Sequence, residues 1–295
     1  MPGFIETCDP SHGSPPNGDS WAHEVKWDGY RGQAHLKDRK VKLFTRRGND
    51  WSKTFYPVTE ALARLKAESA ILDGEVVALK NGLSDFHELR RQIGTVEPEI
   101  IYQAFDLMWL DGEDLRPLPY LVRKNRLRTL LAKAGKRVQY VDFFQVEAKT
   151  MWNSACKLHL EGIVSKRLDS PYTSGRVHTW IKAKCQASET FSVVGFTRDD
   201  NDRMDGLLLG REDKGATVYA GHVEHGISVP DFKELIRRLN PLIVPRSPLA
   251  GMPKNRKAKW VKPSVLVEVA YPNKSGDGRL RHPRFKGIRD DLRSR

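Results

Sequence analysis

A lysine followed by an Asp-Gly pair, in Lys26-Trp27-Asp28-Gly29, is the feature of the sequence that points most directly to chemistry. A lysine amine can attack phosphorus and carry a nucleotide through a phosphoramide bond. Free lysine has a pKa of about 10.4, so a nucleophilic amine needs a pKa lowered by neighbouring cations or a metal. Taken alone, the motif is more typical of a strand that ends in an Asp-Gly turn beside a solvated lysine.

Two further lysines are candidates for that positive field. Lys182 and Lys184 alternate in the run Trp180-Ile181-Lys182-Ala183-Lys184. Alternate residues of a strand point to the same face, so both amines would lie together and could also bind phosphate. A lysine pair of this kind, without other motifs, is more typical of a solvated strand face.

Glu75 and Glu161 are the candidate metal ligands, because Mg²⁺ and Mn²⁺ prefer oxygen donors. Glu75 follows Asp73-Gly74 in an apolar run, and Glu161 precedes the β-branched segment Gly162-Ile163-Val164. Either glutamate alone would be an ordinary surface residue. The sequence contains neither Gly-x-x-x-x-Gly-Lys-[Ser/Thr] nor His-Glu-x-x-His, and its histidines have no ligand spacing, so zinc is not expected.

The chain carries a formal net charge of +13, which favours a polyanionic partner over an anionic membrane surface or mere solubility. From Lys254 to Arg295 there are 13 Lys and Arg against 4 Asp and Glu. Apolar residues such as Trp260, Val267 and Phe285 lie within this stretch, so it is expected to form a folded surface rather than a disordered tail.

Cysteine usage and hydropathy indicate a cytoplasmic protein. Cys8, Cys156 and Cys185 have no metal-ligand spacing, and their odd number favours reduced thiols. No run of 18 apolar residues is long enough for a transmembrane helix, and residues 1–20 do not resemble a secretory signal. We therefore expect no membrane partner and a cytoplasmic location.

The order of expected elements indicates an α+β protein with a largely antiparallel sheet. Short runs rich in β-branched and aromatic residues predict strands at residues 21–26, 32–36, 41–45, 70–79 and 100–109. Helical spacing predicts helices at residues 58–68, 87–93, 123–134 and 150–160. Asp85 followed by Glu88 resembles the start of the second of these helices.

After Lys184 the pattern changes to short strands interrupted by one helix, which is typical of a small OB-fold barrel. Strands are expected at residues 189–196, 206–210, 217–223, 259–261 and 266–270, with a helix at residues 230–239. The boundary near Cys185 to Ser188 predicts two domains, residues 1–186 and 187–295.

Six motifs in one order resemble those of the covalent nucleotidyltransferases, which include ATP-dependent DNA ligases, RNA ligases and mRNA-capping guanylyltransferases. The similarity is greatest to the ligase module of the bacterial end-joining ligase D. The resemblance to the superfamily rests on residues 24–31, 46–48, 73–75, 105–107, 161–184 and 281–291, and the similarity to ligase D rests on residues 24–31, 161–167 and 279–289. The family's last motif usually ends in lysine, where this chain has Leu292, and Arg293 is the candidate to supply that charge.

The resemblance implies an antiparallel-sheet nucleotidyltransferase domain (an ATP-grasp-like ligase domain) followed by an OB-fold domain. It also implies ATP as substrate, AMP carried covalently on Lys26, and Mg²⁺ or Mn²⁺ as cofactor. By the same resemblance, Phe105 stacks on adenine. It also implies that Glu24 and Val25 lie beside the base, with Glu24 reading its amino group, and that Arg31 and Arg47 lie near the nucleotide and the DNA 5′-phosphate. Glu75 and Glu161 would face the metal, with Glu75 also near the ribose. Lys182, Lys184 and Arg289 would assist the chemistry.

The implied partner is nicked or broken duplex DNA, and a DNA-end-binding protein such as Ku, or polymerase and nuclease partners, could be required. Two alternatives remain open from the sequence. One is an RNA ligase or a capping-type guanylyltransferase, and the other is a basic nucleic-acid-binding module that has lost catalysis. Covalent labelling with ATP or GTP would distinguish all three.

Overall fold

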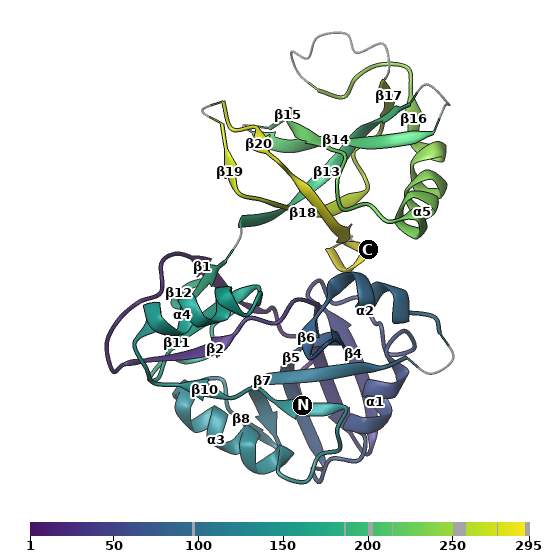
Figure 1. The fold of residues 1–295 in the computed structure, drawn as a ribbon. Coiled ribbons are helices and arrows are strands. Elements are labelled where there is room, and N and C mark those ends of the chain that lie inside the picture. The colour runs from purple at the N-terminus through teal and green to yellow at the C-terminus, as the bar shows by residue number, and fades with distance from the viewer. Residues whose placement is uncertain are drawn as a thin grey trace. The chain divides into compact units, whose positions relative to one another are not determined.

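The computed structural model describes residues 1–95, 98–185, 187–199, 203–213, 215–249, 258–275 and 277–292 (Figure 1). The chain forms two compact units, the first of Met1–Cys185 and the second of the residues from Gln186 onward. Both units are rich in strands, and the expected α+β class is confirmed. No helix among the described residues is long and apolar enough to cross a membrane.

Two sheets form the first unit. The larger sheet has the order β4-β3-β5-β7-β8, with β6 paired to β5 and β9 paired in parallel to β7. Its strands are β3 Tyr30–Lys37, β4 Lys40–Thr45, β5 Ser69–Lys80, β6 Leu83–Ser84, β7 Ile100–Leu110, β8 Glu113–Asp114 and β9 Val138–Tyr140. Four of the five strands expected before residue 110 are found in this sheet, which is largely antiparallel as predicted.

The smaller sheet of the first unit has the order β1-β12-β11-β2-β10. Its strands are β1 Cys8–His12, β2 Trp21–Val25, β10 Phe143–Phe144, β11 Gly162–Arg167 and β12 Gly175–Lys184. β11 is antiparallel to both β2 and β12, whereas β1 runs parallel to β12. A central strand between two partners gives β11 a fixed register, which matters for the residues at its start.

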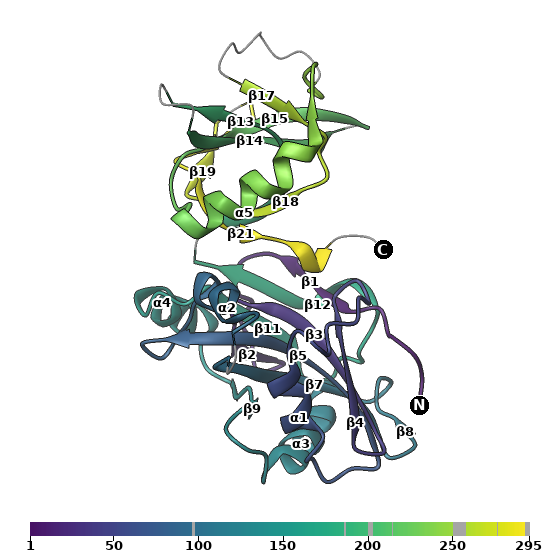
Figure 2. The same cartoon turned by 90° about the vertical axis from the view of Figure 1, so that its right-hand side faces the viewer.

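Four helices cover the sheets of the first unit (Figures 1 and 2). They are α1 Tyr56–Leu62, α2 Phe86–Gln92, α3 Tyr120–Leu131 and α4 Ala148–Lys157. α2 begins as predicted, because the Asp85 carboxylate accepts a hydrogen bond from the Glu88 amide at 3.0 Å. α3 begins three residues earlier than expected, directly after Pro119.

Apolar side chains from both sheets meet in one buried cluster. Cys8 and Trp180 contribute from the smaller sheet, and Ile71 and Met108 contribute from the larger one. A second core lies between the larger sheet and its helices, where the Tyr102 hydroxyl donates to the Gly32 carbonyl at 2.7 Å. The two sheets therefore pack face to face, and residues located where the sheets meet can act together.

The second unit is a curled sheet built around one long strand, β13 Ala187–Arg198. Along one edge β13 pairs with β14, while along the other edge its first half pairs with β18 and its second half with β17. β13 therefore joins β14, β17 and β18 in one curled sheet. The described strands that follow are β14 Met204–Asp213, β15 Ala216–Val223, β16 Ile243–Val244, β17 Ala258–Val261, β18 Leu266–Tyr271, β19 Asn273–Lys274, β20 Leu280–Arg281 and β21 Arg284–Ile288.

One helix, α5 Val229–Leu239, lies between β15 and β16 in the second unit. It begins at a capping box in which the Ser228 and Asp231 side chains satisfy each other's backbone amides. Its apolar residues Leu235 and Leu239 pack into the barrel core. Strands, one helix and further strands in this order confirm the predicted OB-fold.

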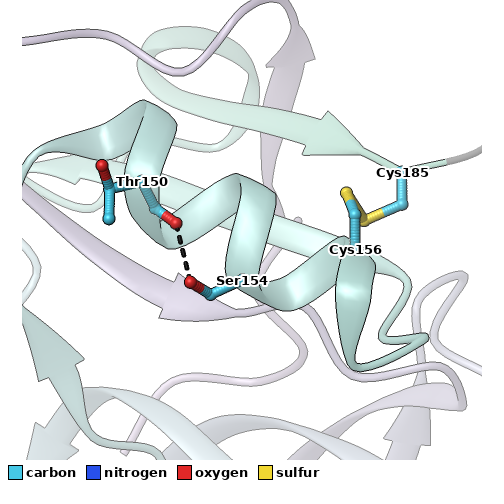
Figure 3. The surroundings of a disulfide bond; sticks show 4 residues. All are labelled: Thr150, Ser154, Cys156 and Cys185. Atoms are coloured by element: carbon cyan, nitrogen blue, oxygen red, sulfur yellow. Dashed lines mark hydrogen bonds between the residues drawn. A yellow bond between two sulfur atoms is a disulfide. The ribbon is translucent and has the colours of Figure 1, made fainter.

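The structure corrects the expectation of three reduced thiols. Cys156, in the last turn of α4, is bonded to Cys185, directly after β12 (Figure 3). The two residues are 29 positions apart in sequence, but the β11–β12 hairpin returns the chain to α4 and leaves their Cα atoms 5.2 Å apart. Cys8 is the free cysteine, and burial raises the pKa of its thiol to about 12.

A buried ion pair links β7 to α3 and gives the first prediction. The Arg123 guanidinium binds both oxygens of Asp106 at 2.8 and 2.9 Å, and both side chains are fully buried. Asp106→Ala would leave an unpaired buried cation, which costs roughly 3–5 kcal/mol of unfolding free energy. Urea unfolding should show this loss as a lower midpoint.

The matched control is Asp169→Ala, since Asp169 pairs with Arg167 on the surface. Exposed pairs are screened by water, so this variant should unfold at nearly the same urea concentration as the parent. Equal midpoints for Asp106→Ala and Asp169→Ala would contradict the structural role given to the buried pair.

Candidate active site

The carboxylate of Glu161 lies between two of the lysines singled out in the sequence. The Lys26 amine donates to Glu161 Oε2 at 2.5 Å, and Lys184 Nζ lies 3.1 Å from Glu161 Oε1. Lys26 follows β2, Glu161 precedes β11 and Lys184 ends β12, so three adjacent strands of the smaller sheet position these residues. The expected grouping of Lys26, Glu161 and Lys184 is therefore present.

A glycine permits this close arrangement. Gly162 has φ +146°, and a Cβ at this position would lie only 2.1 Å from the Ala183 carbonyl oxygen. The backbone of Gly162 also accepts a hydrogen bond from the Lys26 amide at 3.0 Å. The Glu-Gly pair thus sets both the reach of Glu161 and the position of the Lys26 backbone.

The protonation of Lys26 differs from the expectation drawn from the sequence. Burial lowers the pKa of the Lys26 amine, but the carboxylates of Glu161 and Glu75 together raise it by more. The net pKa therefore lies above its usual value. The expected lowering by neighbouring cations is not found because the nearest charges are negative. Without substrate, Lys26 is held as an ammonium ion.

Lys182 is the lysine whose pKa is lowered. Burial is the largest cause, and the positive charges of Lys26, Lys184 and Arg46 add to it, so the pKa of Lys182 falls to about 8. Within the described part of the chain, no carboxylate forms an ion pair with Lys182. Its amine is thus a cation without a fixed counter-ion, which suits the binding of a phosphate.

Arg31 is fixed by carboxylates on both sides. Its guanidinium binds Asp73 at 2.6 and 3.0 Å and Asp9 at 3.2 Å, and the Tyr172 hydroxyl donates to Asp73 at 2.6 Å. The guanidinium carbon also lies 5.4 Å from the centre of the Phe105 ring. Arg31 therefore has a fixed orientation at the edge of the site.

The structure places Arg46, rather than the expected Arg47, beside these groups. Arg46 forms an ion pair with Asp9 and acts electrostatically on Lys182. Arg47 is exposed, and its side chain has no partner among the described residues. The sequence pattern singled out both arginines, which follow β4 and are both exposed, and the structure pairs Arg46 with Asp9.

Glu24 belongs to a buried charged cluster that also reaches Phe105. Its carboxylate lies 2.8 Å from Lys124 Nζ and 2.7 Å from Lys166 Nζ, and it accepts a hydrogen bond from the Tyr120 hydroxyl at 2.6 Å. Lys166 Nζ lies 4.6 Å from the centre of the Phe105 ring. Lys166 thus contacts both Glu24 and Phe105 and links the two residues that were expected to lie near each other.

Tyr120 and Lys124 were not singled out in the sequence, because α3 lies outside every motif. Lys166 was visible as part of the run that begins at Glu161 but carried no assigned role. Val25 is half-buried and pairs with Ile163 of β11, so it follows Glu24 along the same strand edge.

Glu75 and Glu161 are the carboxylates that could hold a divalent cation together with phosphate oxygens. Glu75 lies on β5 opposite Arg31, and its charge acts on the Lys26 amine together with that of Glu161. Gly74 beside it is required, since a Cβ there would lie 2.5 Å from the Tyr102 ring. No cluster of three or more His, Cys, Asp or Glu occurs among the described residues, and Mg²⁺ commonly uses only one or two carboxylates with phosphate oxygens.

Arg289 lies in the second unit and is held by two acidic residues. Its guanidinium binds Asp291 at 2.7 and 2.9 Å, and Glu268 lies 3.8 Å away. Asp291 is fully buried and therefore fixes the arginine. Leu292 follows, as the sequence shows, and Arg293 lies outside the described residues.

The basic C-terminal stretch is folded wherever the structure describes it. Lys259 lies on β17 and Lys286 lies on β21, while Val267 and Phe285 are buried in the barrel core. The prediction of a folded basic surface is confirmed for these residues. Residues 254–257, 276 and 293–295 of the stretch lie outside the described ranges.

Comparison with known proteins agrees with this geometry. Residues 14–184 match the family described as "ATP dependent DNA ligase domain", and residues 200–292 match "ATP dependent DNA ligase C terminal region". The chain is 38% identical over 292 residues to the "Multifunctional non-homologous end joining protein LigD" of Pseudomonas aeruginosa, covering 95% of this chain and 35% of that protein. It is 32% identical over 280 residues to the protein of the same name from Mycolicibacterium smegmatis, covering 92% of this chain and 36% of that protein.

A solved structure of "mycobacterial DNA ligase D complexed with ATP and MES" matches 98% of this chain and 96% of that chain, with a TM-score of 0.75 and 29% identity. The chain spans about a third of the length of the LigD relatives that it matches. Both family matches follow the order of the two units described above. The chain belongs to the ATP-dependent DNA ligase family.

Proposed function

We propose that this chain seals breaks between a 3′-hydroxyl and a 5′-phosphate in duplex DNA, using ATP and a lysyl-AMP intermediate on Lys26. The observation that carries the proposal is the Lys26 amine, held between buried strands beside Glu161, Lys184 and Lys182. A half-buried nucleophile with cations and carboxylates around it suits attack on a polyphosphate.

The proposed reaction has three steps. In the first, Lys26 Nζ forms a bond to the α-phosphorus of ATP, the bond to the β-phosphate oxygen breaks, and pyrophosphate leaves. In the second, AMP passes from Lys26 to the 5′-phosphate at the break, which makes AMP a good leaving group. In the third, the 3′-hydroxyl oxygen attacks that phosphate, AMP leaves, and the strand is sealed.

Glu161 is the proposed acceptor of the proton that Lys26 must lose. The two side chains already share a hydrogen bond of 2.5 Å. Although burial opposes it, the charges of Lys26 and Lys184 lower the pKa of Glu161 to about 2, so without substrate the proton rests on Lys26, and it must pass to Glu161 before the amine can bond to phosphorus. A divalent cation bound by Glu75 and Glu161, Mg²⁺ or Mn²⁺, would neutralise phosphate charge there and favour the neutral amine.

The remaining nucleotide contacts are proposed from the resemblance to the covalent nucleotidyltransferases. Phe105 would stack on adenine, with Glu24 and Val25 at the edge of the base. Lys182 and Lys184 would bind the phosphates, with Lys182 the better suited because it has no ion-pair partner among the described residues. Arg31 would orient the nucleotide, and Arg46 or Arg47 would approach the DNA 5′-phosphate.

DNA binding and biological context are also proposals. The basic surface of the second unit, including Lys259 and Lys286, would contact backbone phosphates with little sequence preference. The names of the LigD relatives refer to non-homologous end joining. We therefore propose a role in end joining in the bacterial cytoplasm, with Ku or polymerase and nuclease partners as candidates.

The first functional prediction concerns the nucleophile. Lys26→Ala should form no covalent AMP adduct, and Lys26→Arg should fail as well, since a guanidinium stays protonated at neutral pH. Gel detection of protein labelled from α-labelled ATP measures this directly. Lys40→Ala, an exposed lysine in the same unit, is the control and should label normally. Label in Lys26→Ala at the parent level would end the assignment, and labelling from GTP alone would indicate a capping-type enzyme.

The second functional prediction uses the pKa of Lys182. This amine carries its charge below its pKa of about 8 and loses it as the pH rises through that value. If the charge binds phosphate, the rate of adduct formation should fall above about pH 8. In Lys182→Arg the cation persists, so the fall should disappear from the profile measured up to pH 9.5. The same fall in both proteins would show that another group causes it.

The third functional prediction separates the chemical steps. Arg289 is proposed to bind the departing pyrophosphate, so Arg289→Ala should slow Lys26 adduct formation on the order of 100-fold. Sealing of a nick that already carries AMP releases no pyrophosphate and should change far less. Single-turnover rates of both steps decide the matter. Normal charging with failed sealing would make Arg289 a DNA contact instead.

A further inference from the structure

Glu24 is a buried carboxylate with two buried lysines as partners. Only 2% of Glu24 is exposed, and Lys124 and Lys166 are 0% and 1% exposed. Charged side chains are seldom withdrawn from water so completely unless they are paired. The cluster holds one negative charge against two positive ones, on the interior strands β2 and β11 and on α3.

The carboxylate has unused hydrogen-bonding capacity on one side. An ionised carboxylate offers about four acceptor positions. Oε1 is used by Tyr120 at 2.6 Å and Lys124 at 2.8 Å, while Oε2 is used by Lys166 at 2.7 Å. Lys166 is also the neighbour of the Phe105 ring. The less occupied oxygen, Oε2, is therefore paired with Lys166, whose amine in turn lies beside the Phe105 ring.

The charge of this carboxylate would decide which purine it accepts. Adenine presents an amino donor at position 6, and guanine presents a carbonyl acceptor there. An ionised carboxylate only accepts hydrogen bonds, whereas a protonated one can also donate. Glu24 therefore discriminates between the two bases only while it remains ionised.

We propose that Lys124 and Tyr120 of α3 are positioning residues for nucleotide choice, which hold Glu24 ionised and oriented so that ATP is used and GTP is rejected. This inference rests on the proposed function, because it assigns a base to the same site. It adds a helix outside the sequence motifs to the nucleotide-binding machinery.

All charged neighbours of Glu24 bear on this role. Lys166 approaches from β11, Lys124 and Tyr120 from α3, Asp106 from β7 and Tyr140 from β9. Asp106 is neutralised by Arg123, so the two lysines dominate. Burial raises the pKa of the Glu24 carboxyl, and the lysines lower it more, so its net pKa lies below the usual value. Without Lys124 the pKa of Glu24 would rise, and the carboxyl would become protonated as the pH falls.

The test compares covalent labelling of the whole chain by α-labelled ATP and GTP between pH 6 and pH 9. In the parent protein the ratio of the ATP rate to the GTP rate should be high and constant with pH. In Lys124→Met the ratio should fall on the order of tenfold or more at pH 6 and recover toward pH 9. Lys136→Met, an exposed lysine beyond the same helix, is the matched control and should keep the parent ratio.

Glu24→Gln provides a second test that does not disturb α3. A glutamine is uncharged at every pH and carries both a donor and an acceptor, so the ratio should be low throughout. A parent-like ratio at every pH in Lys124→Met, or in Glu24→Gln if Lys124→Met does not fold, would overturn the proposal. Equal loss with both nucleotides would reduce Lys124 to a structural role and also overturn it. If the parent forms no adduct with either nucleotide, the proposed function itself fails.

Discussion

The Glu161 carboxylate between Lys26 and Lys184 is the interaction on which the site depends. Two unit charges 4 Å apart interact by about 4 kcal/mol at an effective dielectric constant of 20. Lys26 and Lys184 therefore need the negative charge of Glu161 between them to lie in one site. The carboxylate in turn reaches them because Gly162 lets β11 and β12 approach closely. Removing the carboxylate would therefore alter the position of the nucleophile as well as its charge.

Pairing of buried or half-buried charges with opposite charges recurs across the first unit. Arg31 is paired with Asp73, Arg123 with Asp106, and Glu24 with two lysines, all at or near the meeting of the two sheets. Fixed charges of both signs are thus in place before a substrate arrives. Such preorganisation spares the reorganisation that water would need around a polyphosphate. It also explains why Lys26 is protonated here, since its nearest neighbours are negative.

Much of this could be predicted from the sequence, and the failures have physical reasons. Alternation along one strand placed Lys182 and Lys184 together, and motif order placed Glu161 near Lys26. The sequence could not show that Lys124 reaches Glu24, because that contact joins residues 100 positions apart through a helix with no motif. Nor could an odd number of cysteines reveal the bond between Cys156 and Cys185, which depends on how the β11–β12 hairpin returns to α4.

The central claim is that carboxylates raise the pKa of Lys26, whereas burial and neighbouring cations lower the pKa of Lys182. Nitrogen-15 NMR of lysine side chains in the nucleotide-free protein tests this most directly, with signals assigned by Lys26→Arg and Lys182→Arg. The account predicts that Lys182 loses its proton near pH 8, while Lys26 remains an ammonium ion well above that pH. Deprotonation of Lys26 before Lys182 would contradict it.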